Sequence, residues 1–115
     1  MNLDEARSLI GRLLPRIEEF LVVRADLAEL RADLEATGSS RLGALADAKG
    51  LEARLYADLE VFSSGGTEVK GFAPLLLDVP GERDGEPVLW CWLEGDEDIA
   101  WYHRPDTGFA GRRRV

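Results

Sequence analysis

The sequence contains a single cysteine among 115 residues, so no disulfide can form within the chain. Structural disulfides belong mainly to oxidising compartments, and one cysteine is typical of a protein from the reducing cytoplasm. The longest unbroken apolar run, residues 88–93, has only six residues, whereas a bilayer span needs roughly 20 apolar residues. Acidic residues follow the initial methionine where a signal peptide would carry basic ones. We therefore expect a cytoplasmic protein that does not enter a membrane.

Basic residues are also in short supply, because 14 lysines and arginines stand against 22 acidic residues and give a net charge of −8. A surface of this sign repels phosphate backbones, so nucleic acid is not an expected partner. The chain has no phosphate-binding glycine motif, no serine elbow and no paired-carboxylate signature. A lone histidine and the absence of metal-ligand spacing lead us to expect no cofactor and no metal site.

What remains is the composition of an ordinary globular protein. Hydrophobic residues make up 45% and charged residues 31% of the chain. The length is enough for one hydrophobic core, so we expect residues 1–115 to form a single domain.

The first half of the chain has helical periodicity. Asn2 and Glu5 have the spacing of a capping box, and apolar residues then recur every three or four positions as far as Leu34. Pro15 falls inside this pattern, and we expect it to bend the helix rather than end it.

A second apolar stripe follows after a short break. Gly38 is a suitable left-handed cap, and Ser39 or Ser40 can begin the next helix, whose stripe ends at Phe62. A short linker between two amphipathic helices predicts an antiparallel helical hairpin over residues 2–62.

The period becomes strand-like beyond the turn signal at residues 63–66. Short polar turns between consecutive strands predict an antiparallel meander, so we expect a three-stranded sheet over residues 67–104 and an irregular tail over residues 105–115. The expected strands cover residues 75–79, 87–93 and 98–103. The predicted fold class is α+β, with a long antiparallel helical hairpin followed by a small antiparallel β-meander.

The helical stripe has more apolar surface than three short strands can cover. We therefore expect a homodimer formed through the helical hairpin, in a four-helix arrangement.

Six short motifs follow one another along the chain. They are Leu-Leu-Pro at 13–15, Glu-Val-Lys-Gly at 68–71, Leu-Asp-Val-Pro at 77–80, Leu-Trp-Cys-Trp at 89–92, Ile-Ala-Trp-Tyr-His at 99–103 and Gly-Phe-Ala-Gly-Arg at 108–112. In this order the chain resembles the prokaryotic family known as domain of unknown function 2203. The family usually has Trp-His where this chain has Tyr102-His103, which leaves the histidine in place. The resemblance supports the architecture and implies no activity, cofactor or catalytic residue.

Residues 89–103 hold all three tryptophans and the only cysteine and histidine. Strand alternation places Trp90 and Trp92 on one face of the strand and Leu89, Cys91 and Leu93 on the other face. We expect the latter three to face the helices.

Trp101 and His103 share a face of the next predicted strand. We expect these two residues to join Trp90 and Trp92 in an aromatic platform that, with Arg112 of the tail, binds a protein or small-molecule ligand. The alternative, which is the more usual role of aromatic residues on strands, is that the indole rings fill the core or a dimer interface.

His103 is the candidate for a general base or metal ligand, with Asp78 and Glu94 as the carboxylates that would complete such a site. Ordinary hydrogen bonding is the simpler role for this histidine. Cys91 suits a small buried side chain, and the alternation predicts that it faces away from His103.

Two functions follow from these residues. The first is a non-enzymatic, dimeric binding module that uses the C-terminal aromatic hairpin. The second is a small metal-dependent or acid/base enzyme with a site around His103. We favour the first because no catalytic signature is present in the sequence.

Overall fold

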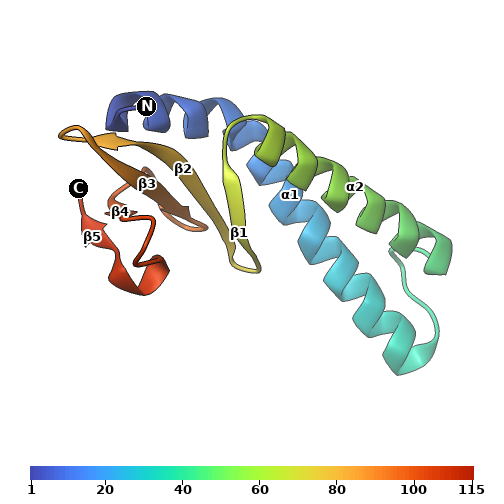
Figure 1. Ribbon diagram of the computed structural model, residues 1–115. Coiled ribbons are helices and arrows are strands. Elements are labelled where there is room, and N and C mark those ends of the chain that lie inside the picture. Colours follow the sequence, from blue (N-terminus) through green and yellow to red (C-terminus); the bar gives the residue numbers. More distant parts are fainter. The chain divides into compact units, whose positions relative to one another are not determined.

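The computed structural model describes residues 1–115 and contains two helices followed by a five-stranded antiparallel sheet (Figure 1). The α+β class, the helical hairpin and the β-meander are therefore confirmed. The chain divides into two compact units, one formed by residues 1–13 with 62–115 and the other by residues 14–61. Neither helix combines the length and apolar composition that crossing a bilayer requires.

Helix α1, Leu3–Thr37, begins with the predicted capping box. The Asn2 amide donates to Glu5 Oε1, and the Glu5 amide donates to Asn2 Oδ1, both at 2.8 Å. Each side chain thus satisfies a backbone donor that the first helical turn leaves unpaired. The helix runs through Pro15 without ending, as the continuous apolar stripe predicts.

Most of α1 and of helix α2, Leu45–Ser64, makes up the unit of residues 14–61. Asp58 is almost completely buried and accepts a hydrogen bond from Arg16 Nε at 2.6 Å. Arg54 and Glu19 form a second ion pair between the helices at 2.8 Å. The apolar residues buried in this unit are Ile17, Phe20, Val23, Leu27, Leu30, Ala48 and Leu55.

The second helix begins later than Ser39 or Ser40, so the predicted start is wrong. Gly38 has the expected left-handed conformation with φ of 79°, but Gly43 has φ of 134°, which no helix accommodates. The Ser40 hydroxyl donates to Asp33 Oδ2 at 2.6 Å instead of capping the helix. Asp47 accepts the Ala44 amide at 2.8 Å and so forms the N-terminal cap.

The other unit contains a sheet in which each strand pairs with the next along the chain. Its strands are β1 Glu68–Phe72, β2 Leu75–Arg83, β3 Glu86–Leu93, β4 Trp101–His103 and β5 Arg113–Arg114. The prediction of three strands missed β1 and β5, which are short edge strands with no fully buried residue to mark them in the sequence. The tail is likewise not irregular throughout, because a 3₁₀ turn at Phe109–Gly111 precedes β5.

Strand β2 is also longer than predicted, because it continues through Pro80. A proline has no N–H group to donate to a neighbouring strand. The pairing of β1 with β2 ends at Asp78, so at Pro80 no β1 residue is left without a hydrogen-bond donor. The turn that follows consists of Asp84 and Gly85, with φ of 53° and 82°. Two positive φ values at an Asp-Gly pair are the signature of a tight hairpin, which allows β2 and β3 to pair to their ends.

The core of this unit lies between one face of the sheet and the first turns of α1, which cross β2 and β3 (Figure 1). Trp90 Nε1 donates to the Met1 carbonyl at 3.1 Å, and Arg7 donates to the Ile99 carbonyl at 2.8 Å. Gly81 has no side chain at the point where Met1 approaches, and a Cβ there would collide with the Met1 carbonyl. The buried sheet residues on this face are Leu75, Leu77, Val79, Val88, Trp90 and Trp92.

The prediction that Leu89, Cys91 and Leu93 face the helices is therefore wrong. The large indoles fill the layer between helix and sheet because they offer the most apolar area, and the Trp90 N–H finds a backbone acceptor there.

Candidate functional site

The second face of the sheet brings together residues from β2, β3 and β4. In the pairing register, Cys91 lies opposite both Asp78 and Trp101, and Leu89 lies opposite His103. Direct partners in an antiparallel pair project to the same side of the sheet. Asp78, Cys91, Trp101 and His103 therefore share one face.

This register overturns the predicted aromatic platform. Trp90 and Trp92 lie on the α1 side, whereas Trp101 and His103 lie on the opposite side. Alternation within each strand was predicted correctly, but the pairing between strands decides which faces coincide, and it joins Trp101 to Cys91. The prediction that Cys91 and His103 face apart is wrong for the same reason.

His103 and Asp78 form a buried pair, with side chains only 4% and 3% exposed. His103 Nε2 lies 3.0 Å from Asp78 Oδ2, and His103 Nδ1 lies 2.9 Å from the Arg104 carbonyl. A carbonyl can only accept, so Nδ1 carries a hydrogen and donates it. The hydrogen bond between Nε2 and Oδ2 then requires a further proton on either the imidazole or the carboxyl group.

The other oxygen of this carboxyl group, Asp78 Oδ1, is buried and has no hydrogen-bond partner. The His103 ring is thus held at both nitrogens, whereas Asp78 is satisfied at only one oxygen. A ring fixed on both sides has a defined orientation, which suits a structural clamp between β2 and β4.

Cys91 lies beside this pair and is buried. Burial, and secondarily the negative charge of Asp78, raise the pKa of the Cys91 thiol from 9.0 to about 12. The thiolate is the nucleophilic form of cysteine, so this environment suppresses its reactivity.

Glu94, the third predicted candidate, has a structural role at the start of β2. Its Oε1 accepts the Leu75 amide at 2.8 Å, and its own amide donates to the Leu75 carbonyl at 2.8 Å. These two bonds join the ends of β2 and β3. No group of three or more histidine, cysteine or acidic side chains is placed to hold a metal ion.

Arginines and aromatic rings form a surface on the Trp101 side of the sheet, which we call the arginine–aromatic surface and which consists of Trp101, Phe109, Arg112 and Arg114. The Arg112 guanidinium carbon lies 4.6 Å from the centre of the Trp101 ring and 4.4 Å from that of Phe109. The Arg114 guanidinium carbon lies 5.1 Å from the centre of the Trp101 ring. These are cation–π distances, so the surface is organised without carboxylates.

Trp101 and Arg112 were predicted as part of the binding surface, whereas Phe109, within the Gly-Phe-Ala-Gly-Arg motif, and Arg114 were not assigned individually. The signal for Phe109 was present in the Gly-Phe-Ala-Gly-Arg motif, because an aromatic residue between glycines has no predicted core to fill. Arg114 could not be assigned before the pairing of β5 with β4 placed it opposite Trp101.

Comparison with known proteins gives one match. A family model described as an uncharacterised conserved protein, DUF2203, matches residues 1–115. No curated protein and no solved structure matches the chain.

The environment of Cys91 predicts an unreactive thiol. At pH 8 the raised pKa lowers the thiolate fraction about 1,000-fold relative to an exposed cysteine. Alkylation by iodoacetamide, followed by mass spectrometry, should therefore be much slower in native protein than in urea-denatured protein. Equal alkylation rates in the two states would contradict the buried position.

The buried pair of His103 and Asp78 predicts a difference between two substitutions. Asp78→Ala leaves the Nε2 side of the ring without a partner, which should cost about 1–3 kcal/mol of unfolding free energy. Asp78→Asn keeps an oxygen that accepts a hydrogen bond and should cost less. Urea unfolding followed by tryptophan fluorescence measures both variants, and equal stability of both with the wild type would show that the pair stabilises nothing.

Proposed function

Because the chain belongs to the DUF2203 family, whose description states no activity, we propose a function from the site alone. The protein is a non-enzymatic binding module, dimeric through its helical hairpin, that recognises an acidic protein partner with the arginine–aromatic surface. This surface replaces the predicted platform as the contact region of the C-terminal hairpin.

The proposal rests on the surroundings of two arginines, Arg112 and Arg114. Arg112 and Arg114 stack on aromatic rings and make no ion pair with any carboxylate of the chain. A stacked guanidinium keeps its N–H edge available for a carboxylate, which it can bind through two parallel hydrogen bonds. In a chain with a net charge of −8, two unpaired cations on one surface are best explained by an acidic partner.

The rings contribute the apolar part of this recognition. Trp101 is half-buried and Phe109 is exposed, so the surface combines an indole with arginines. Tryptophan and arginine are the residues that most often dominate the binding energy of protein interfaces.

The alternative is a small acid/base or metal-dependent enzyme around His103. The short distance between His103 and Asp78 supports it, because an oriented imidazole is the form that acid/base catalysis uses. The burial of both side chains opposes it, because a substrate would have no access to either ring nitrogen, and both nitrogens are already occupied. We therefore prefer the binding module.

The proposed dimer rests on apolar side chains that the helical hairpin leaves exposed. Val22 is 61%, Leu45 67% and Tyr56 65% exposed. Burial of such residues against a second hairpin would remove apolar area from water at roughly 25 cal/mol per Å².

Two further features of the proposal come from composition. The single buried cysteine is compatible with a reducing cytoplasm, which is the proposed location. The net negative charge opposes association with nucleic acid, so the proposed partner is a protein.

Substitution of single arginines tests the recognition of acidic partners. Poly-L-glutamate serves as the probe, with binding followed by calorimetry at low salt. Arg112→Gln should weaken binding about tenfold, since it removes one charge-assisted contact. Arg113→Gln is the matched control, because Arg113 pairs with Tyr102 and projects to the other face of the sheet. An equal loss in both variants would show a general charge effect and no specific surface.

Sedimentation equilibrium tests the dimer. The wild type should sediment as a dimer at micromolar concentration, and the combined substitutions Val22→Glu and Tyr56→Glu should give a monomer because they place charges in the proposed interface. Phe109→Glu, outside the hairpin, should remain dimeric. A monomeric wild type would overturn this part of the proposal.

A further inference from the structure

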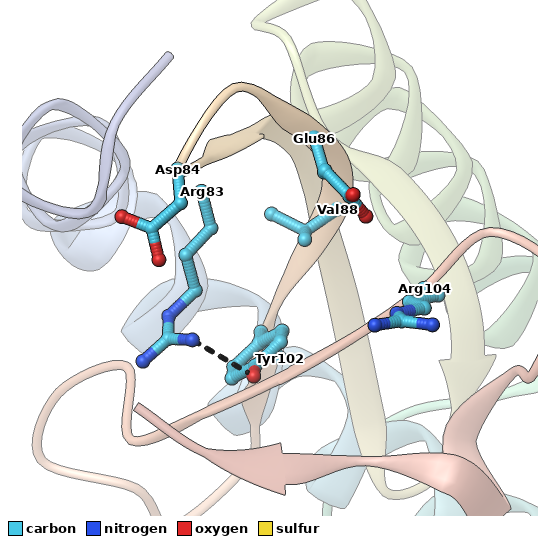
Figure 2. Close-up of a pocket in the computed structure, with 6 residues that line it drawn as sticks. All are labelled: Arg83, Asp84, Glu86, Val88, Tyr102 and Arg104. Atoms are coloured by element: carbon cyan, nitrogen blue, oxygen red, sulfur yellow. Dashed lines mark hydrogen bonds between the residues drawn. The ribbon is translucent and has the colours of Figure 1, made fainter.

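A cavity of about 240 Å³ lies beside the turn that joins β2 and β3 (Figure 2). Its lining residues are Arg83, Asp84, Glu86, Val88, Tyr102 and Arg104. Tyr102 lies between Arg83 on one side and Arg104 on the other, and Glu86 and Val88 lie above it in this view. The volume is below the roughly 300–1,000 Å³ of sites for drug-sized ligands, so any occupant must be small.

The base of this cavity is organised before any ligand arrives. Arg83 Nη1 donates to the Tyr102 hydroxyl at 3.0 Å, and the Arg83 guanidinium carbon lies 4.6 Å from the centre of the Tyr102 ring. The same ring meets the edge of the buried Trp90 at a centroid distance of 5.9 Å. Tyr102 and Arg83 therefore hold defined positions, which reduces the conformational entropy lost on binding.

Three charged side chains of the cavity have no partner within the chain. Arg104, Asp84 and Glu86 make no side-chain hydrogen bond and no ion pair, and Arg83 is paired only with the neutral Tyr102. Arg104 follows directly after β4. Its carbonyl accepts a hydrogen bond from the His103 ring, which holds this end of the strand in place. These residues are exposed to solvent and have no protein partner, so they are available to a ligand that carries the opposite charges.

The balance of these charges selects the class of ligand. Two guanidinium groups attract an anionic group, but two carboxylates at the same cavity repel a phosphate dianion or a polyanion. A simple cation meets the converse repulsion from the arginines. A ligand that carries both a carboxylate and an ammonium group satisfies all four charges.

We propose that this cavity binds a free amino acid with an apolar side chain. The carboxylate of the ligand lies between Arg83 and Arg104, and its ammonium group faces the carboxylates of Asp84 and Glu86. The side chain of the ligand packs on Val88 and the Tyr102 ring. This site lies on the opposite face of the sheet from Trp101, so it is independent of the proposed recognition of an acidic partner.

Titration of isotope-labelled full-length protein by NMR tests the proposal, with L-leucine as the probe. Amide shifts should saturate and be confined to the residues around the turn, Tyr102 and Arg104. N-acetyl-L-leucine lacks the ammonium group and L-leucinamide lacks the carboxylate, so each should bind at least about tenfold more weakly.

Variants separate this site from the arginine–aromatic surface. Arg104→Gln should weaken L-leucine binding about tenfold while leaving poly-L-glutamate binding unchanged. Arg112→Gln should show the reverse, because Arg112 lies against Trp101. Amide spectra of the unbound variants that match the wild type outside the changed residue establish that both are folded.

Three results would overturn the proposal. The first is no saturable shift with L-leucine at millimolar concentration. The second is binding of L-leucinamide or N-acetyl-L-leucine as tight as that of L-leucine, which would mean that one charge suffices. The third is tighter binding of inorganic phosphate at the same residues, which would make the cavity an anion site.

Discussion

The pairing of β3 with β4 is the constraint on which both proposed binding sites of this protein depend. With Cys91 opposite Trp101, the side chains of β4 are sorted between the two faces of the sheet. A shift of one residue would move Tyr102 to the face of Asp78 and Cys91, and Trp101 and His103 to the face that packs on α1. Both proposed sites rest on this register, because one uses Trp101 and the other uses Tyr102.

The register also explains why polar groups are buried beside an inert thiol. Asp78, Cys91 and His103 meet on the face opposite α1, where the carboxylate bonds to the imidazole and helps to raise the pKa of the thiol. A buried His–Asp pair costs desolvation energy, which the hydrogen bonds at both ring nitrogens offset. In return the pair fixes β4 against β2, and the charged residues on either side of β4 are held in place.

Two surfaces of opposite character result from this arrangement. The arginine–aromatic surface carries unpaired positive charge, whereas the cavity beside the β2–β3 turn carries balanced charge in a small volume. The charges of the two sites thus suit different proposed ligands, an acidic protein on one face of the sheet and a zwitterion on the other. The predicted site contained one residue of the arginine–aromatic surface from the tail, Arg112, and no residue of the cavity. The cavity was missed because only strand pairing brings Arg83 to Tyr102 and Arg104, and no spacing in the sequence connects these two parts of the chain.

The sequence by itself determined the capping box at Asn2, the two helices and the order of helices before strands. These features depend on contacts between neighbours three or four residues apart, which periodicity reveals directly. Only the tertiary structure decided the start of α2 beyond Gly43, the strands β1 and β5, and the faces that the indole rings occupy. These depend on hydrogen bonds between residues distant in the chain. The sequence leaves the register and the buried face open because residues 88–93 are apolar on both faces of the strand.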